Sequence, residues 1–178
     1  MTTLETLLND PDLAGVWTLA PDRCAITFKV RNMWGLLNVK GRFTEFSGDG
    51  QLTGTGAVFG RLDIRSASLN TGIARRDTHL RSADFFDVER FGEISVVVTA
   101  VHPTQGKAAD LRANFTIKGI TASLPVSVTV TELDDGAIRI AGQTKVDRSQ
   151  FDLGWNKFGM VGATVTAAAE TIFVRAPQ

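Results

Sequence analysis

Residues 112–131 read RANFTIKGITASLPVSVTVT. Apolar side chains occupy every second position in each half of this stretch: Ala113, Phe115 and Ile117, then Val126, Val128 and Val130. Because side chains alternate between the two faces of a β-strand, each half predicts a strand with one apolar and one solvated face. This pattern is typical of antiparallel sheets, since the strands of parallel sheets are buried on both faces.

The same alternation recurs outside this stretch, at residues 26–31, 61–65 and 138–140. Turn-forming residues lie between the apolar segments at Ser47–Gly50, Pro103–Gly106 and Asp134–Gly136. Their spacing predicts about eight strands in an up-and-down order. Closure into a barrel removes the exposed edges of such a sheet. We therefore expect an all-β fold, an eight-stranded antiparallel barrel.

One internal segment departs from the alternation. Ile73–Ser82 follows residues suited to a helix cap, Ile73 and Leu80 lie seven positions apart, and Asp77 precedes Arg81 by four. This spacing predicts a helix of two to three turns, short enough to cap one end of a barrel.

The N-terminal residues 1–15 are predicted to be an extension that precedes a barrel domain at 16–178. Thr3–Asn9 fits one or two helical turns ended by Pro11, and a mobile tail fits equally well. No lysine or arginine precedes Arg23, and no apolar run approaches the about 20 residues of a membrane span. We therefore expect a cytoplasmic protein without stable membrane insertion.

The charge and the rare side chains exclude several classes of protein. The 178 residues carry 19 basic and 19 acidic side chains, and this balance argues against a nucleic-acid-binding protein and against a polybasic membrane-surface protein. The single cysteine, Cys24, excludes an intrachain disulfide and a cysteine-rich zinc site. His79 and His102 are too few for a three-histidine site. We expect neither a metal nor a cofactor.

The chain has 11 phenylalanines and three tryptophans but no tyrosine. Any one of these rings fits an ordinary core position. Together they fit an eight-stranded barrel whose interior holds one small apolar ligand. The candidates for lining that interior are Phe28, Val30, Trp34, Phe43, Phe59, Leu80, Phe85, Phe86, Phe115, Trp155 and Phe158.

A polar cluster, Arg75, Arg76, Asp77 and His79, lies in the predicted helix. It fits three descriptions: a solvated helix face, a contact for the head group of a ligand, or an acid–base site. No nucleophile motif or paired-carboxylate pattern supports catalysis.

Several motifs resemble those of the YceI-like family, lipocalin-like proteins that bind polyisoprenoids. Residues 76–87, RDTHLRSADFFD, resemble the helix segment of the family. Four other segments follow the family pattern in order along the chain: VKGRF at 39–43, SASLNTG at 66–72, FTIKGIT at 115–121 and VDRSQF at 146–151. The resemblance covers about Trp17 to Val174, nearly the whole chain.

The resemblance implies a lipocalin-like barrel with a short helix over one end and an apolar pore, often in a homodimer. It implies a non-catalytic carrier for a long-chain isoprenoid, such as a polyprenyl chain or an isoprenoid quinone, or for a similar amphiphilic lipid. Arg75, Arg76 and His79 are the residues expected at the head group. Two alternatives stay open: a stress-related interaction module with a filled barrel, and an enzyme that acts on a lipid-like substrate through His79 and Asp77.

Overall fold

The computed structural model describes residues 3–156, 159 and 161–176. They form one antiparallel sheet of eleven strand segments, two α-helices and five short 3₁₀ turns, η1–η5. The strands are β1 Gly15–Leu19, β2 Ala25–Asn32, β3 Leu37–Phe43, β4 Phe46–Leu52, β5 Val58–Arg65, β6 Leu69–Asn70, β7 Glu93–Pro103, β8 Ala108–Ile117, β9 Ile120–Glu132, β10 Ile138–Asp147 and β11 Thr164–Arg175. The helices are α1 Leu4–Leu8 and α2 Ala74–Arg81.

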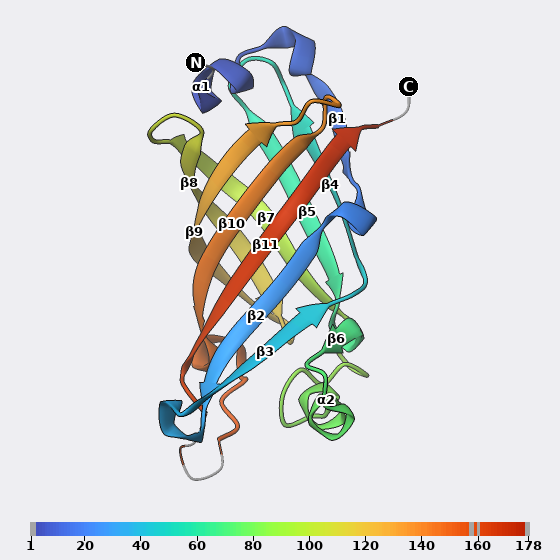
Figure 1. Ribbon diagram of the computed structural model, residues 1–178, viewed down its shortest axis with the longest axis vertical. Coiled ribbons are helices and arrows are strands. Elements are labelled where there is room, and N and C mark those ends of the chain that lie inside the picture. Colours follow the sequence, from blue (N-terminus) through green and yellow to red (C-terminus); the bar gives the residue numbers. More distant parts are fainter. Residues whose placement is uncertain (1–2, 157–158, 160, 177–178) are drawn as a thin grey trace.

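The sheet closes on itself through β11. Phe173–Arg175 of β11 pair with β1, and β1 also pairs with β4, so that β1, β4, β5, β7, β8, β9, β10 and β11 form a ring of eight strands. Val165–Glu170 of the same strand pair with β2, which carries β3 and β6 beyond the ring. The expected closed antiparallel barrel of eight strands is confirmed (Figure 1).

The alternation in the sequence corresponds to the observed burial. Phe115 and Ile117 on β8, and Val128 and Val130 on β9, are buried, whereas the polar residues between them lie on the outer face. The expected turns at 103–106 and 134–136 connect β7 to β8 and β9 to β10. These strands therefore follow the elementary two-residue period.

The turn expected at Ser47–Gly50 was wrong, because these residues lie inside β4. Gly48 pairs with Leu62 of β5, and a Cβ at Gly48 would lie 2.9 Å from the Arg61 carbonyl oxygen. The glycines of this segment thus allow β4 and β5 to approach closely, rather than reversing the chain.

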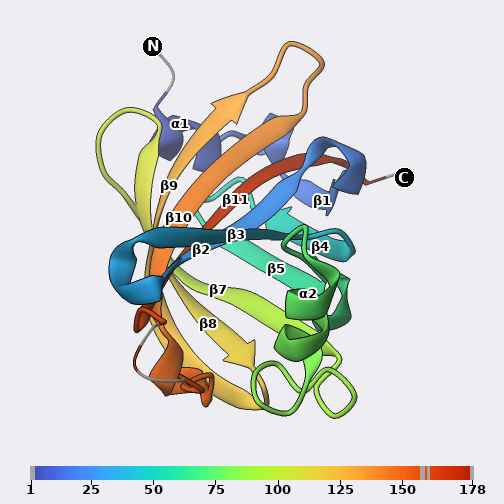
Figure 2. The ribbon, with the colours of Figure 1, turned by 60° about the horizontal axis from the view of Figure 1, so that its bottom comes forward.

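The two helices lie at opposite ends of the barrel (Figures 1 and 2). Helix α2 forms where the sequence predicted it. Of the two alternatives for the N-terminal segment, the structure shows the helix, α1. This helix is docked on the barrel: the Leu4 N–H donates to the Gly106 carbonyl at 2.9 Å, and the Gly56 N–H donates to the Leu8 carbonyl at 3.0 Å. Its leucines, Leu4, Leu7 and Leu8, are buried.

Candidate functional site: an apolar cavity along the barrel

The barrel encloses a cavity of about 470 Å³. Leu4, Leu7 and Leu8 of α1 form part of its wall at one end, and Leu80, Phe85 and Phe86 form part of its wall at the α2 end. Between the ends the wall consists mainly of inward-facing aliphatic and aromatic side chains of the strands. A barrel of eight strands is wide enough to hold one small ligand, and this one leaves space for it.

Most residues predicted to line the interior border this cavity. These are Phe28, Val30, Phe43, Phe59, Leu80, Phe85, Phe86, Phe115 and Trp155. Phe158 lies outside the described residues. That the nine cavity residues contact a ligand stays a prediction.

Trp34 does not border the cavity. It lies in the turn η3 (Met33–Gly35) between β2 and β3, with a backbone φ of 53° and a side chain that is 66% exposed. The placement of this ring in the interior was wrong, because β2 ends at Asn32 and residue 34 lies in the exposed turn that follows it.

Phe59 borders the cavity as predicted, but its side chain is not enclosed in the interior, since it is 59% exposed. It lies on β5 outside the segment Arg61–Arg65 that pairs with β7. The ring therefore stands beside a stretch of wall where β5 and β7 are not hydrogen-bonded to each other.

Aromatic rings pack against one another near the middle and the α2 end of the cavity. The ring centroids of Phe28 and Phe43 are 5.5 Å apart, and those of Phe43 and Phe86 are 6.1 Å apart and nearly perpendicular. The second pair is edge-to-face, an arrangement that aromatic rings prefer, and all three rings border the cavity.

The predicted head-group residues lie at the α2 end, whereas other polar side chains, such as Gln51 on β4 and Arg61 on β5, border the cavity elsewhere. Arg76 and His79 border it, whereas Arg75 is exposed and does not. The Arg76 Nε donates to Thr71 Oγ1 at 2.8 Å and one terminal nitrogen donates to the Thr71 carbonyl at 2.9 Å. The helix thus brings two of the three predicted head-group residues to the cavity.

His79 does not pair with Asp77. Its Nε2 lies 2.9 Å from Asp84 Oδ2, and its ring stands edge-on to the rings of Trp155 and Phe85, with centroids 4.5 and 5.2 Å away. The buried Asp77 carboxylate instead accepts the backbone N–H of Thr71 at 3.0 Å and also its hydroxyl. The acid–base pair that an enzyme with these two residues requires is not formed.

Arg148 is a cavity residue that the sequence reasoning missed, although it belongs to the VDRSQF motif. It is 6% exposed, and its guanidinium donates to four carbonyls, those of Leu153, Gly162, Trp155 and Val161, at 2.5–3.4 Å. Burial lowers the pKa of this guanidinium below its usual range. The side chain holds the loop after η5 (Arg148–Phe151) against the barrel end.

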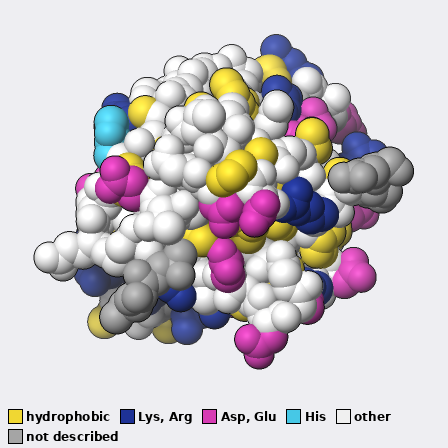
Figure 3. Space-filling view, turned by 90° about the horizontal axis from the view of Figure 1, so that it is seen from above, with side chains coloured by type: hydrophobic (Ala, Val, Ile, Leu, Met, Phe, Trp, Pro, Cys, Tyr) yellow, Lys and Arg dark blue, Asp and Glu magenta, His cyan; other side chains and the backbone are white. Residues whose placement is uncertain are grey.

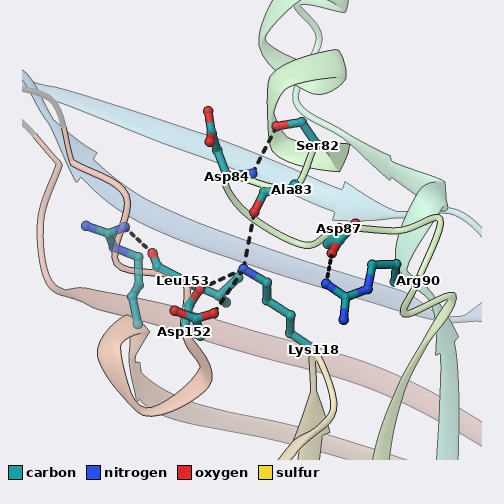
Figure 4. A network of polar contacts seen from close by, with 9 residues as sticks. Ser82, Ala83, Asp84, Asp87, Arg90, Lys118, Asp152 and Leu153 are labelled. Atoms are coloured by element: carbon teal, nitrogen blue, oxygen red, sulfur yellow. Dashed lines mark hydrogen bonds and ion pairs between the residues drawn. The ribbon is translucent and has the colours of Figure 1, made fainter.

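Lys118, at the turn between β8 and β9, joins the two loops beside the α2 end (Figure 4). Its Nζ donates to the Ala83 carbonyl at 3.3 Å and to the Asp152 carbonyl at 3.0 Å, and it lies 3.4 Å from the Asp152 carboxylate. One side chain therefore connects the loop after α2 to the loop that Arg148 holds.

The leucines of α1 also line the cavity, and no prediction included them. The spacing of Leu4, Leu7 and Leu8 places them on one helix face, which was the available signal. Within the described residues, no cluster of three histidine, cysteine, aspartate or glutamate side chains is placed to hold a metal ion. No helix among those residues is long and apolar enough to cross a membrane.

The model of the YceI-like domain family matches residues 17–173 of this chain. A UPF0312 protein of Pseudomonas putida strain GB-1 is 35% identical over 106 residues, which are 60% of this chain and 54% of that protein. A UPF0312 protein of Shewanella sp. strain ANA-3 is 33% identical over 104 residues, 57% of this chain and 54% of that protein. The chain thus spans about half the length of these curated relatives.

Two solved structures share the fold. The crystal structure of Burkholderia cenocepacia BcnA superposes with a TM-score of 0.80 at 20% identity, covering 86% of this chain and 98% of that one. A polyisoprenoid binding domain from Saccharophagus degradans, implicated in plant cell wall breakdown, superposes with a TM-score of 0.73 at 18% identity, covering 90% and 98%. At these identities, both superpositions show that the barrel fold is shared.

Proposed function

The chain belongs to the YceI-like domain family, and from this premise we propose that it is a non-catalytic carrier that holds one isoprenoid-type lipid inside its barrel. The observation that carries the proposal is the apolar cavity of about 470 Å³ that extends between the two helices. The polyisoprenoid binding domain from Saccharophagus degradans, which has the same fold, supports the class of ligand.

The energetics favour a long apolar chain over a short one. Each buried methylene contributes about 0.8 kcal/mol, so fifteen carbons contribute roughly 12 kcal/mol. Association costs about 4–15 kcal/mol in lost freedom of motion. A short acyl chain therefore gains little, whereas a polyprenyl chain or the tail of an isoprenoid quinone binds without polar contacts.

We place the head group at the α2 end. His79 and Trp155 border the cavity and also reach solvent, with a His79 side chain 39% exposed and Trp155 37% exposed. Arg76 and Arg148 supply positive charge beside them. A phosphate or a quinone carbonyl seated there would meet donors, while the chain extends toward α1.

The two alternatives fit the structure less well. A filled barrel leaves no cavity, and this barrel encloses one. An enzyme acting through His79 and Asp77 needs the two side chains together, and they have different partners.

The test is native mass spectrometry of the purified protein, followed by extraction and identification of the bound lipid. A polyprenol and an isoprenoid quinone are then offered to delipidated protein. We expect one lipid per barrel. Protein that stays empty with both ligands would refute the carrier function.

A matched pair of variants locates the binding. Ala167 faces the cavity from β11, whereas Ser127 is exposed on the outer face of β9. Ala167→Phe fills the cavity and should abolish uptake, while Ser127→Phe should leave it unchanged. Circular dichroism confirms that both variants fold. Equal uptake by the two would place the lipid outside the barrel.

Two further expectations stay predictions. The resemblance leads us to propose a homodimer, which sedimentation velocity tests. The cytoplasmic location expected from the sequence is tested by cell fractionation.

A further inference from the structure

The turn between β2 and β3 carries an exposed apolar cluster, here called the apolar tip: Met33, Trp34, Leu36 and Leu37. Their exposed fractions are 38%, 66%, 81% and 58%. Single exposed apolar residues are ordinary, but a contiguous group marks a surface that contacts another apolar phase. Met33 and Trp34 also have backbone φ values of 50° and 53°, a conformation that disfavours such side chains. Neither burial nor backbone preference explains this composition.

A row of lysines lies beside the tip on the outer face of the barrel. Lys145 on β10 pairs with Thr166 on β11, Thr166 pairs with Lys29 on β2, and Lys29 pairs with Lys40 on β3. At strand spacings of about 4.8 Å, this lysine row spans roughly 14 Å. Like charges directly opposite each other, as in Lys29 and Lys40, destabilise a sheet.

The other charges of this face are mostly basic as well. Arg31 and Arg42 lie two residues from the row on β2 and β3, and Asp147 is the acidic residue two positions after Lys145. Among the described residues, none of the three lysines forms an ion pair. A hollow is lined by Lys29, Arg31 and Lys145, among other residues. The zero net charge of the chain therefore conceals a local basic surface.

The base of the apolar tip adjoins the cavity. Asn32 borders the cavity and directly precedes Met33, and the Arg31 carbonyl accepts the Gly162 N–H at 2.8 Å, which ties the base of the tip to the loop held by Arg148. Figures 1 and 2 place this turn at the end opposite α1. The α1 end, seen in Figure 3, shows acidic side chains near the middle of its face.

We propose that the apolar tip and the lysine row form a docking surface for a bilayer that contains anionic lipids. Trp34, Leu36 and Leu37 enter the interface between head groups and acyl chains, where tryptophan is favoured. The lysines meet the anionic head groups around the tip. Docking in this orientation brings the α2 end of the cavity to the membrane surface, and the α1 end faces away.

The charges argue against two other partners. A symmetric contact between two copies through this face would set the lysine row against itself. A purely electrostatic partner, such as a nucleic acid, leaves the apolar tip without a role. A bilayer with anionic head groups satisfies both features at once.

The test is co-sedimentation of the full chain with vesicles of phosphatidylcholine, with and without phosphatidylglycerol. We expect at least tenfold stronger binding to the anionic vesicles, weakened by added salt. Each of Lys29→Gln, Lys40→Gln and Lys145→Gln should weaken binding about fivefold. The double variant Trp34→Ser/Leu36→Ser should reduce binding to both kinds of vesicle.

Two variants at the α1 end serve as controls. Val16 is 51% exposed, and Lys107 follows Gly106, which contacts α1. Val16→Ser and Lys107→Gln should bind vesicles as the unmodified chain does. Equal binding by the tip, row and control variants would overturn the proposal. Equal binding to neutral and anionic vesicles would also overturn it. A chain that binds an acidic peptide through its lysine row but binds no vesicles would overturn it as well.

A second readout separates this proposal from the carrier function. The tip and row variants keep the cavity, so they should take up a polyprenol from detergent solution normally while transferring it between vesicles more slowly. If the unmodified chain takes up no polyprenol from detergent, the carrier function is refuted but the docking proposal is not. Vesicle docking is measured without a ligand in the cavity.

Discussion

The ring of Phe28 lies directly over Gly41 on the inner wall of the barrel. The two residues pair across β2 and β3, and a Cβ built at Gly41 would lie 2.3 Å from Cζ of Phe28. The glycine thus creates the space that the ring occupies, and the ring in turn borders the cavity. Any side chain at position 41 must displace the ring from its place on the cavity wall.

Gly41→Ala should therefore reduce both stability and lipid uptake. Overpacking of this kind costs typically about 1–3 kcal/mol. Urea unfolding measures the loss, and native mass spectrometry measures the uptake. Gly154→Ala is the control, because no atom lies within 4 Å of a Cβ at that position. Phe28→Leu added to Gly41→Ala should restore part of both properties, and no restoration would contradict the packing argument.

Arg148→Met should destabilise the α2 end of the barrel. The substitution keeps an unbranched apolar stem but removes the donors to the carbonyls of Leu153 and Gly162, and each buried carbonyl left unpaired costs about 1–3 kcal/mol. Urea unfolding should show the loss. Arg139→Met is the control, since that arginine pairs with Glu170 on the surface. Equal losses would mean that the buried carbonyls find other donors.

Leu7→Ala should loosen α1 from the end of the barrel. Removing a buried leucine side chain costs about 2–5 kcal/mol, and here the loss is confined to a short helix held by few hydrogen bonds. The Gly56 amide, which donates to the Leu8 carbonyl, should exchange its hydrogen faster. Glu5→Ala, on the exposed face of α1, should leave this exchange unchanged. Protection of Gly56 in both variants would show that α1 does not depend on its leucines.

Asp147 should contribute to stability at neutral pH and lose this contribution in acid. Hydrogen bonds from the Ser149 hydroxyl and backbone N–H, at 2.7 and 2.9 Å, hold the pKa of its carboxyl below the usual value. A lowered pKa in the folded state stabilises the protein above the unfolded pKa of about 3.9, and the effect disappears as the pH falls through the folded pKa.

Thermal unfolding between neutral pH and pH of about 3 measures this effect. Asp147→Asn should have a lower Tm than the unmodified chain at neutral pH, and the two should converge in acid. Ser149→Ala removes the main donor and should reproduce part of the change. A constant difference in Tm across the range would show that the carboxyl does not titrate with folding.

The sequence by itself determined the strands at 26–31, 61–65, 112–131 and 138–140, a helix within 73–82 and the family pattern. These features depend on local chemistry, namely the two-residue alternation, the turn residues and the short motifs. Local chemistry also misled once, at Ser47–Gly50, where glycines that suit a turn instead allow close approach of β4 and β5.

Only the tertiary structure decided which rings face the cavity. Trp34 and Phe28 are alike as apolar residues of one region of the sequence, yet the first protrudes from a turn and the second lines the wall. The direction of a side chain depends on where a strand ends. Likewise Lys29, Lys40 and Lys145 become neighbours only through the register of four strands, since pairing joins residues far apart in the chain.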